Sequence, residues 1–195
     1  MLILLVLSYA WGSLLPGVLI GRYWFGQDIR DRDNPGASGS WRQYGPGVGV
    51  VVAALDLAKG AAVTLIGLEL AFSPLQLVLV VAAVVAGHNW PLYFGFRGGG
   101  GLATLAGALL ALSPRYTLLG IVVTVAVAIF YRVSPLRRRL PLAALPAGAC
   151  LGIPFFLGLT WWVTERTVFL ATIVAGSLIA LRGLQMLGER KNGTG

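Results

Sequence analysis

Long apolar segments, most of them close to the length that crosses a lipid bilayer, dominate this sequence. Six of them lie at about residues 2–20, 48–70, 75–94, 115–131, 140–159 and 167–187. A spanning helix needs about 20 mostly apolar residues. Of the 195 residues, 57% are hydrophobic and 11% are charged, and a water-soluble globule could not bury so much apolar surface. The pattern predicts an all-α polytopic membrane protein forming one domain, residues 1–195.

A seventh apolar segment, residues 102–112, is only about 16 Å long as a helix, and charge decides whether it crosses. If it crosses and the N-terminus is outside, the outer turns hold only Arg115 and Arg166, and all other interhelical arginines are cytoplasmic. Positive charge favours cytoplasmic loops. We therefore predict seven transmembrane helices with the N-terminus outside, the C-terminus cytoplasmic and a short fourth span. The predicted polar cytoplasmic loops cover about residues 21–47, 95–101 and 132–139.

Charge and residue usage exclude several classes of function. The net charge is +8, but the arginines lie between apolar segments without the aromatic and basic groove typical of nucleic-acid binding. The single cysteine, Cys150, and the single histidine, His88, are too few for a metal site. The apolar N-terminus has no basic residues before it, so we expect a first span and no cleaved signal peptide. We predict no metal, no cofactor and no nucleic-acid partner.

Two polar segments have the composition of phosphate sites. In the first, Asn34-Pro35-Gly36 predicts a turn, small residues follow, and Arg42 adds a guanidinium. The alternative is an ordinary solvated loop. In the second, His88 is followed by Arg97 and a glycine run at residues 98–101 that opens a helix. Free N–H groups at such a helix start suit phosphate, although a glycine-rich packing face remains the alternative.

Two further groups of charges lie in or beside apolar segments. Asp56 and Lys59 are three residues apart in the second span, so they share one helix face and can pair. Charged residues inside a membrane are costly and often functional, but a self-neutralising pair that fixes helix packing explains them equally well. The arginines at 137–139 are interpreted as a topology anchor that contacts lipid headgroups.

Four segments in order resemble the motifs of one family, the bacterial acyl-phosphate-dependent glycerol-3-phosphate acyltransferases of the PlsY type. The similar segments are Gly12-Ser13-Leu14-Leu15-Pro16-Gly17, Asn34-Pro35-Gly36-Ala37 with Arg42, Asp56-Leu57-Ala58-Lys59-Gly60, and Gly87-His88 with Pro91, Phe94, Phe96, Gly98, Gly99, Gly101, Ala103 and Thr104. The family has seven spans and a cytoplasmic active site, so the resemblance implies a multi-pass protein of the bacterial inner membrane with that topology.

The resemblance also implies a reaction and a set of site residues. An acyl group passes from acyl phosphate to the sn-1 hydroxyl of glycerol 3-phosphate, giving lysophosphatidate and phosphate, with membrane lipids as neighbours. The expected catalytic residues are Arg42 and His88. The expected phosphate-binding residues are Asn34, Gly36, Ser38, Arg97, Gly98, Gly99, Gly101 and Thr104. Structural roles are expected for Ser13, Asp56, Lys59 and Asn89.

The sequence departs from the family pattern at several of its polar positions. Asp31-Arg32-Asp33 stands where the family has G-S-G, Gly39 replaces an asparagine, and Gly100 replaces a lysine. The C-terminal R-H-R-x-N-I-x-R-L pattern is not recognisable in residues 181–190. These differences keep a second hypothesis open, a repurposed homologue acting as a lipid-binding or regulatory membrane protein. A small transporter ranks last, because the sequence has no inverted repeat. Acyl-chain length and oligomeric state stay open.

Overall fold

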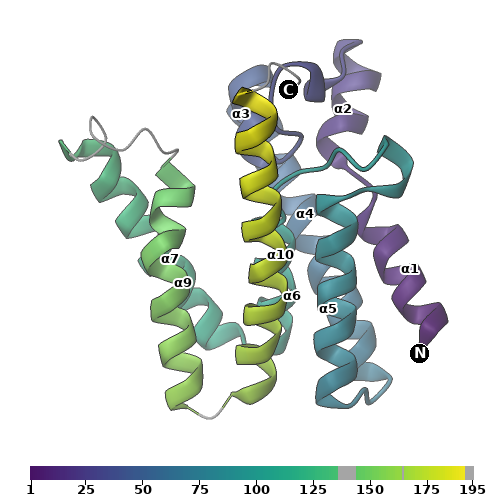
Figure 1. Cartoon of the computed structure of the whole chain (residues 1–195), viewed down its shortest axis with the longest axis vertical. Coiled ribbons are helices and arrows are strands. Elements are labelled where there is room, and N and C mark those ends of the chain that lie inside the picture. The colour runs from purple at the N-terminus through teal and green to yellow at the C-terminus, as the bar shows by residue number, and fades with distance from the viewer. Residues whose placement is uncertain (136–143, 164, 192–195) are drawn as a thin grey trace.

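The computed structural model describes residues 1–135, 144–163 and 165–191, and the regular structure in these ranges is helical (Figure 1). Helix α5 lies among α1, α4, α6 and α10, while α7 packs mainly on α9. The helices are α1 (Leu2–Gly12), α2 (Pro16–Phe25), η1 (Ile29–Asp31), α3 (Ala37–Tyr44), α4 (Pro46–Glu69), α5 (Pro74–Asn89), η2 (Leu92–Phe94), α6 (Leu102–Leu112), α7 (Pro114–Val133), α9 (Ala144–Trp162) and α10 (Arg166–Lys191).

Five segments of the described chain are long and apolar enough to cross a membrane. They are Leu2–Phe25, Pro46–Glu69, Pro74–Phe94, Pro114–Val133 and Arg166–Glu189. Of two shorter apolar helices, Leu102–Leu112 coincides with the predicted fourth span, and Ala147–Trp162 overlaps the predicted sixth span at residues 140–159 and ends three residues beyond it. The expectation of an all-α membrane protein is confirmed, and the short fourth helix has the bounds that the sequence predicts. The arginines at 137–139 lie outside the described residues.

The first apolar segment is not the continuous helix that its hydropathy predicts. The chain breaks between α1 and α2, where Leu15 is extended with φ −105° and ψ 100°. Pro16 causes the break, because proline lacks the N–H that a helix needs and disfavours helical backbone in the residue before it. Helix α2 then continues to Phe25, five residues beyond the predicted end of the span.

The polar segment at residues 21–47 is more ordered than the loop that its composition predicts. It contains the end of α2, the short helix η1 and the eight residues of α3. Gly39 allows α3 to fold back on the turn before it, because a Cβ there would overlap the carbonyl oxygen of Asn34. The buried Ile29 packs with Leu15 and Phe94, so this segment is docked on the bundle.

Glycines let the helices around the site approach closely. A Cβ on Gly12 of α1 would overlap the Val84 carbonyl of α5, and one on Gly87 would overlap the Tyr9 carbonyl. Gly60 of α4 and Gly107 of α6 are packed on each other's helix in the same way. Small residues permit such close contact between membrane helices. These contacts fix α1 on α5 and α4 on α6.

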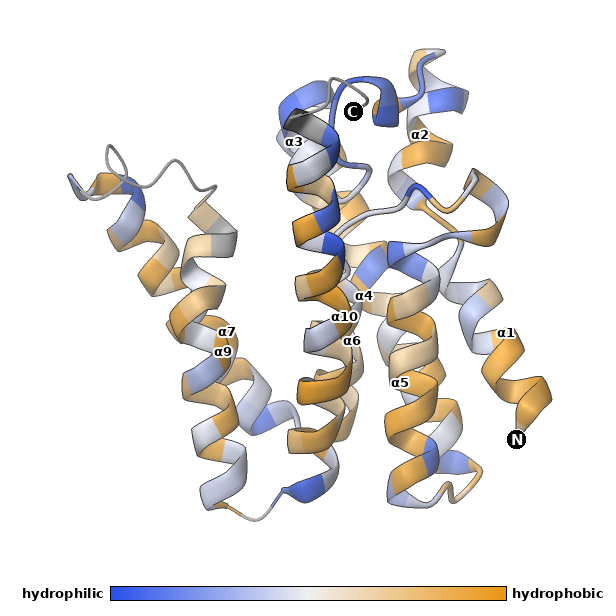
Figure 2. Ribbon diagram, viewed as in Figure 1, coloured by the Kyte–Doolittle hydropathy of each residue, from blue (hydrophilic) through white to orange (hydrophobic). Residues whose placement is uncertain are grey.

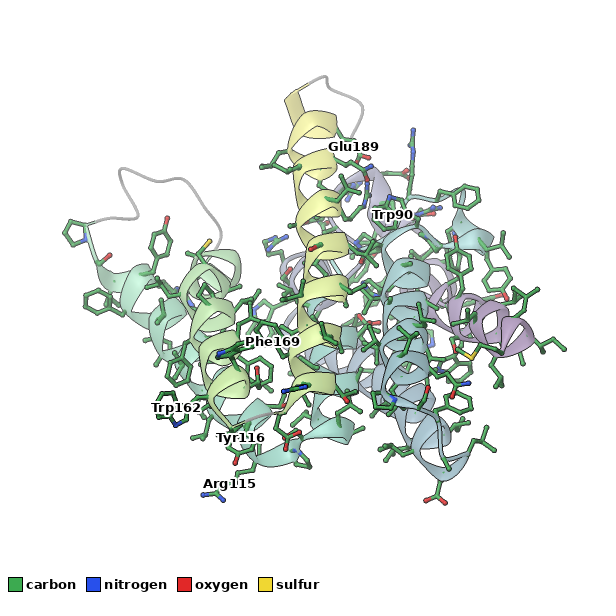
Figure 3. All side chains as sticks on the ribbon, turned by 60° about the horizontal axis from the view of Figure 1, so that its bottom comes forward. Trp90, Arg115, Tyr116, Trp162, Phe169 and Glu189 are labelled. Atoms are coloured by element: carbon green, nitrogen blue, oxygen red, sulfur yellow. The ribbon has the colours of Figure 1, made fainter. Side chains whose placement is uncertain are left out.

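The two ends of the bundle differ in polarity. Figure 2 shows hydrophilic residues gathered around α3, the end of α2 and the C-terminal end of α10, while the helices below are mostly hydrophobic. In Figure 3, Trp90 and Glu189 lie at this end, and Arg115, Tyr116 and Trp162 lie at the opposite end. The chain thus brings its polar segment, the residues after α5 and the end of α10 to one end.

Candidate active site

Lys59 lies at the centre of a buried polar cluster where three helices meet. Its Nζ donates to the carbonyl oxygens of Gly12 at 3.0 Å and Leu14 at 2.8 Å. These carbonyls belong to the break between α1 and α2, where the helix cannot satisfy its own last acceptors. Lys59 is 4% exposed, so its charge is placed where buried backbone acceptors need a donor.

The third hydrogen bond of Lys59 goes to His88, with Nζ and Nδ1 2.9 Å apart. An ammonium has three donors and no acceptor, so Nδ1 of His88 accepts. The neutral imidazole then carries its proton on Nε2. Asp56 Oδ1 lies 3.1 Å from Lys59 Nζ and 3.4 Å from His88 Nδ1, in ionic contact without a well-aligned hydrogen bond. Asp56 and Lys59 therefore pair, and His88 completes the cluster.

The glycine run at residues 98–101 wraps around the other side of His88. Gly99 N donates to the His88 carbonyl at 3.1 Å, and a Cβ on Gly99 would overlap His88 Nε2. The Nε2–H group therefore faces the backbone that leads into α6. Gly101 is the N-cap of α6 with φ +78°, a left-handed conformation that favours glycine. The run places the open N–H groups of a helix start beside the histidine.

Three buried polar atoms around this run have no hydrogen-bond partner within the described chain. They are Asn89 Oδ1, Thr104 Oγ1 and Arg182 Nε. Asn89 Nδ2 donates to the Leu178 carbonyl at 3.3 Å, and Gly101 is packed so closely that a Cβ would overlap Asn89 Oδ1. Buried polar groups normally have partners, so the groups around the run can form further hydrogen bonds.

Arg182 is a site residue that the sequence analysis did not identify. It is 4% exposed on α10, its Nη2 donates to the Gly98 carbonyl at 3.1 Å, and its Nη1 pairs with Glu189 at 2.8 Å. The available signal was a lone arginine late in the last apolar helix, and the positive-inside rule explained it without a site. A buried arginine is costly unless it is paired, and here it holds the glycine run against α10.

Arg42, Asn34, Gly36 and Ser38 form a second group near the same end of the bundle. Arg42 Nε and Nη2 bind the two carboxylate oxygens of Asp33 at 2.8 and 2.6 Å. This pair raises the pKa of the Arg42 guanidinium above its usual value. Among the described residues, no hydrogen bond or ion pair joins Arg42 to His88. The two expected catalytic residues therefore have different partners, Asp33 for Arg42 and Lys59 for His88.

Arg30 connects the second group to the segment after α5. Its guanidinium donates to the carbonyl oxygen of Phe94 and lies 5.5 Å from the centre of that ring. It also binds Asp28 at 2.7 Å, and the hydrogen bond from Arg30 holds the pKa of the Asp28 carboxyl well below its usual range. This contact ties the polar segment at residues 21–47 to η2.

Ser13 has a comparable linking role inside the bundle. Its hydroxyl donates to the Tyr9 carbonyl at 2.8 Å and accepts from Leu92 N at 3.1 Å. Ser13 is fully buried, so it anchors η2 to the end of α1. Helix η2, which follows His88 in the chain, is therefore held by both Arg30 and Ser13.

An apolar groove of about 480 Å³ leads away from the cluster. It is lined by residues of α1, α4 and α5 with Leu14, Phe72 and Tyr93, and it extends along α1 from Leu4 to Trp11. Leu14 also contributes the carbonyl that Lys59 binds, so one end of the groove adjoins the cluster. From Leu4 to Trp11 the helical rise is about 10 Å, the length of part of an acyl chain.

The remaining expected residues are less enclosed. Arg97 is exposed and has no side-chain partner among the described residues. Gly100, which stands where the resemblance implies a lysine, has open space beside it, because a Cβ there would meet only Met186 Cε at 3.9 Å. The run therefore contributes backbone groups without a cation of its own at position 100.

Comparison with known proteins agrees with this geometry. A family model described as glycerol-3-phosphate acyltransferase matches residues 2–186. The chain is 40% identical over 194 residues to glycerol-3-phosphate acyltransferase 2 of Deinococcus radiodurans, covering 97% of this chain and 95% of the relative. It is 37% identical over 147 residues to glycerol-3-phosphate acyltransferase 2 of Moorella thermoacetica, covering 74% and 75%.

A solved structure is also similar over almost the whole chain. The crystal structure of PlsY (YgiH), an integral membrane glycerol 3-phosphate acyltransferase in its glycerol 3-phosphate form, superposes with a TM-score of 0.81 and 27% identity. The match covers 99% of this chain and 92% of that one. On these grounds, the chain belongs to the PlsY-type glycerol-3-phosphate acyltransferase family of integral membrane proteins.

Proposed function

We propose that this protein transfers an acyl group from acyl phosphate to the sn-1 hydroxyl of glycerol 3-phosphate. The observation that carries the proposal is the position of His88. Its Nδ1 binds Lys59 at 2.9 Å, and its Nε2 faces Gly99 in the glycine run before α6. A helix start beside a polarised imidazole suits a phosphate group and the charge that develops during acyl transfer.

The phosphates of both substrates have separate places in this proposal. The backbone N–H groups at the start of α6, with Arg97 beside them and Thr104 in the first turn, bind one phosphate. Arg42, with Asn34, Gly36 and Ser38 around the start of α3, binds the other. Guanidinium groups bind phosphate through charge-assisted hydrogen bonds, and Arg42 is 48% exposed at its side chain, so a soluble substrate can reach it.

His88 acts as a hydrogen-bond donor in this mechanism. Because Lys59 donates to Nδ1, the neutral ring presents N–H at Nε2 and has no lone pair there to remove a proton. Its contribution is to hold an oxygen that gains negative charge in the transition state. Lys59 and Asp56 position the ring through their contacts with Nδ1.

The reaction is a direct transfer that needs no covalent intermediate on the protein. The acceptor hydroxyl oxygen forms a bond to the acyl carbon, the bond from that carbon to the phosphate oxygen breaks, and the hydroxyl proton leaves with inorganic phosphate. An acyl phosphate is a mixed anhydride and is already activated. Positioning and neutralisation of charge are then the main contributions of the protein.

The acyl chain of the donor lies in the apolar groove of α1, α4 and α5. Leu14 supports this placement, because its side chain lines the groove while its carbonyl oxygen binds Lys59. The carbonyl end of a donor in the groove is therefore near the cluster of Lys59 and His88. Its hydrocarbon tail gains from contact with apolar surface.

We also propose seven crossings, the N-terminus outside, and the active site on the cytoplasmic face of the bacterial inner membrane. The distribution of arginines supports this topology, with Arg115 at the end of the bundle opposite Trp90 and Glu189 (Figure 3). The test labels Arg32→Cys and Arg115→Cys, each in a Cys150→Ala background, with a membrane-impermeant maleimide in intact cells. Arg115→Cys should react and Arg32→Cys should react only after lysis; the reverse pattern contradicts the topology.

Product analysis tests the proposed reaction. Purified protein in detergent, given palmitoyl phosphate and glycerol 3-phosphate, should yield 1-palmitoyl lysophosphatidate and an equal amount of phosphate. Palmitoyl-coenzyme A in place of palmitoyl phosphate should give less than about one hundredth of that rate, since its thioester carries no phosphate on the acyl carbon for the site to bind. Equal use of the thioester, or acylation at sn-2, contradicts the proposed donor or position.

Two observations favour the second hypothesis, a repurposed lipid-binding homologue. Arg42 is already bound by Asp33 at 2.6 Å, and position 100 has no lysine. On that hypothesis the protein binds lysophosphatidate without forming it. Binding of lysophosphatidate together with no product from palmitoyl phosphate, in a preparation that retains its thermal unfolding transition, would favour this alternative.

A further inference from the structure

The carboxylate of Asp33 occupies the same edge of Arg42 that a phosphate would use. Arg42 donates from Nε to Asp33 Oδ2 at 2.8 Å and from Nη2 to Oδ1 at 2.6 Å. This two-point arrangement is the preferred geometry of guanidinium with carboxylate and with phosphate alike. A phosphate that binds Arg42 at this edge must therefore replace Asp33.

Asp33 is the better anchored partner of the pair. Its side chain is 10% exposed, compared with 48% for Arg42. Its Oδ1 also accepts from Asn34 N at 2.7 Å, and its own N–H donates to the Ile29 carbonyl at 2.8 Å. Because Asp33 is held by the backbone around it, exchange with a ligand requires the more exposed Arg42 to move away.

The position of Asp33 in the chain places its ion pair with Arg42 beside the expected phosphate-binding residues. It immediately precedes Asn34, whose turn leads into α3, and Arg42 lies in the last turn of that same helix. The ion pair therefore spans α3, from the residues before its start to its end. The negative charge stands beside the expected phosphate-binding residues at the start of α3, where it repels a second anion.

We propose that Asp33 competes with the phosphate of glycerol 3-phosphate for Arg42 and thereby sets the concentration of acceptor that the enzyme requires. The inference rests on the proposed function, since it takes Arg42 as a ligand of the acceptor phosphate. Asp33 lowers the affinity for the acceptor by a contact that must break when the acceptor binds. It has no part in the chemical step, so it acts on KM and leaves kcat nearly constant.

The test is a comparison of neutral and charge-conserving variants. Initial rates are measured with saturating palmitoyl phosphate and varied glycerol 3-phosphate for wild type, Asp33→Asn, Asp33→Ser, Asp33→Glu and Asp31→Asn. Asp31 is exposed and two residues away, so Asp31→Asn removes the same charge from the same segment. Both neutral variants at position 33 should lower KM by about fivefold, at the upper end for an exposed ion pair.

The controls separate competition from structural support. Asp33→Glu and Asp31→Asn should change KM by less than about twofold, and kcat should stay within about twofold for all four variants. If Asp33 instead positions Arg42 for the substrate, both neutral variants raise KM, and the proposal is overturned. A KM that stays at the wild-type value in both neutral variants overturns it as well.

Binding of inorganic phosphate separates this inference from the proposed reaction. Calorimetric titration of the detergent-solubilised full chain requires no turnover. Asp33→Asn should bind phosphate about fivefold more tightly than wild type, and Arg42→Ala should abolish the difference. Tighter binding without product formation would sink the proposed reaction and keep the role of Asp33. Normal product formation with unchanged phosphate affinity would support the proposed reaction and overturn the role of Asp33.

Discussion

The ammonium of Lys59 donates to Nδ1 of His88 across 2.9 Å. The same group donates to the carbonyl oxygens of Gly12 and Leu14, which the break between α1 and α2 leaves without helical partners. One buried lysine therefore supports the broken first span and fixes the tautomer of the histidine. Lys59 therefore links the carbonyls that the break at Pro16 leaves free to the position of His88.

Lys59→Met should destabilise the protein strongly. The variant keeps a similar side-chain volume but leaves two backbone carbonyls and Asp56 buried without their donor. Loss of one partner of a buried charge pair costs about 3–5 kcal/mol. Unfolding in mixed micelles with sodium dodecyl sulphate measures the change. Thr64→Val, at a fully buried threonine of the same helix that bonds only its own turn, should cost about 1 kcal/mol. Equal effects of the two variants would show that the cluster has no special role.

His88→Gln should retain more activity than His88→Ala. Glutamine can present an N–H donor near the position of Nε2, whereas alanine removes the donor. We expect His88→Ala to lower kcat by about 10²–10³-fold, as for loss of one oxyanion donor. His88→Gln should lose about tenfold or less. If both variants lose activity equally, His88 acts through its basicity and the assigned donor role is wrong.

The membrane class, the short helix at residues 102–112 and the pairing of Asp56 with Lys59 could be predicted from the sequence. Apolar length and arginine placement are sufficient for the first two. The pairing of Asp56 with Lys59 follows from their spacing, but the contact of Lys59 with α1 does not. It depends on a helix break, and Pro16 lies within a segment whose hydropathy is continuous. A hydropathy average over a window detects the length of an apolar segment, but it does not detect the single N–H group that Pro16 lacks.

Two other features depended on tertiary contacts that no local pattern reveals. Arg182 looked like a topological charge, because its bond to the Gly98 carbonyl joins residues 84 positions apart. The polar segment at residues 21–47 looked like a loop, because its helix α3 is short and rich in glycine and serine. Docking of Ile29 and Arg30 against Phe94 orders that segment, and intrinsic helix propensity does not.

Gly99→Ala and Gly100→Ala should differ sharply although they are neighbours. A methyl group on Gly99 would overlap His88 Nε2, whereas one on Gly100 would lie in open space with Met186 at 3.9 Å. Gly99→Ala should therefore lower kcat/KM by about 100-fold, comparable to the loss of a transition-state donor, and Gly100→Ala by much less. Similar losses in both variants would mean that the run acts through flexibility and not through contact with His88.

Gly100→Lys should strengthen substrate binding. The open space at position 100 admits a longer side chain, and an ammonium there adds positive charge beside the start of α6. We expect a lower KM for a phosphate substrate by about three- to tenfold, the effect of one favourable charge contact near a surface. Gly100→Met provides a control of similar length without charge. An equal change in KM for the two variants would contradict a role for charge.

Arg182→Met should loosen the glycine run and lower kcat more than it changes KM. The substitution removes the bond to the Gly98 carbonyl and the pair with Glu189. Misplacement of groups beside His88 by about 1 Å costs about 100-fold in rate. Glu189→Gln, which removes the pair but keeps Arg182, should cost less than about fivefold. Kinetics at saturating substrates measure both variants, and a larger loss for Glu189→Gln would contradict this role of Arg182.

The ion pair of Asp28 predicts a loss of stability in acid. The pKa of the Asp28 carboxyl is depressed in the folded protein by its hydrogen bond from Arg30, so the unfolded chain binds the proton more readily. Its stabilising contribution is fully present above the unfolded pKa, about 3.9, and is lost as the pH falls toward the lower folded value. Wild type should lose more stability between pH 5 and 3 than Asp28→Asn. Parallel curves in chemical unfolding at each pH would contradict the prediction.

Phosphate release that depends on glycerol 3-phosphate tests the proposed acyl transfer most sharply. Wild type, His88→Ala and Arg42→Ala are purified in detergent and given palmitoyl phosphate with and without the acceptor. Wild type should show acceptor-dependent release and both variants at least about 100-fold lower rates, with thermal unfolding of all three preserved. Release that does not depend on glycerol 3-phosphate, or that is equal in wild type and both variants, would contradict the proposed acyl transfer.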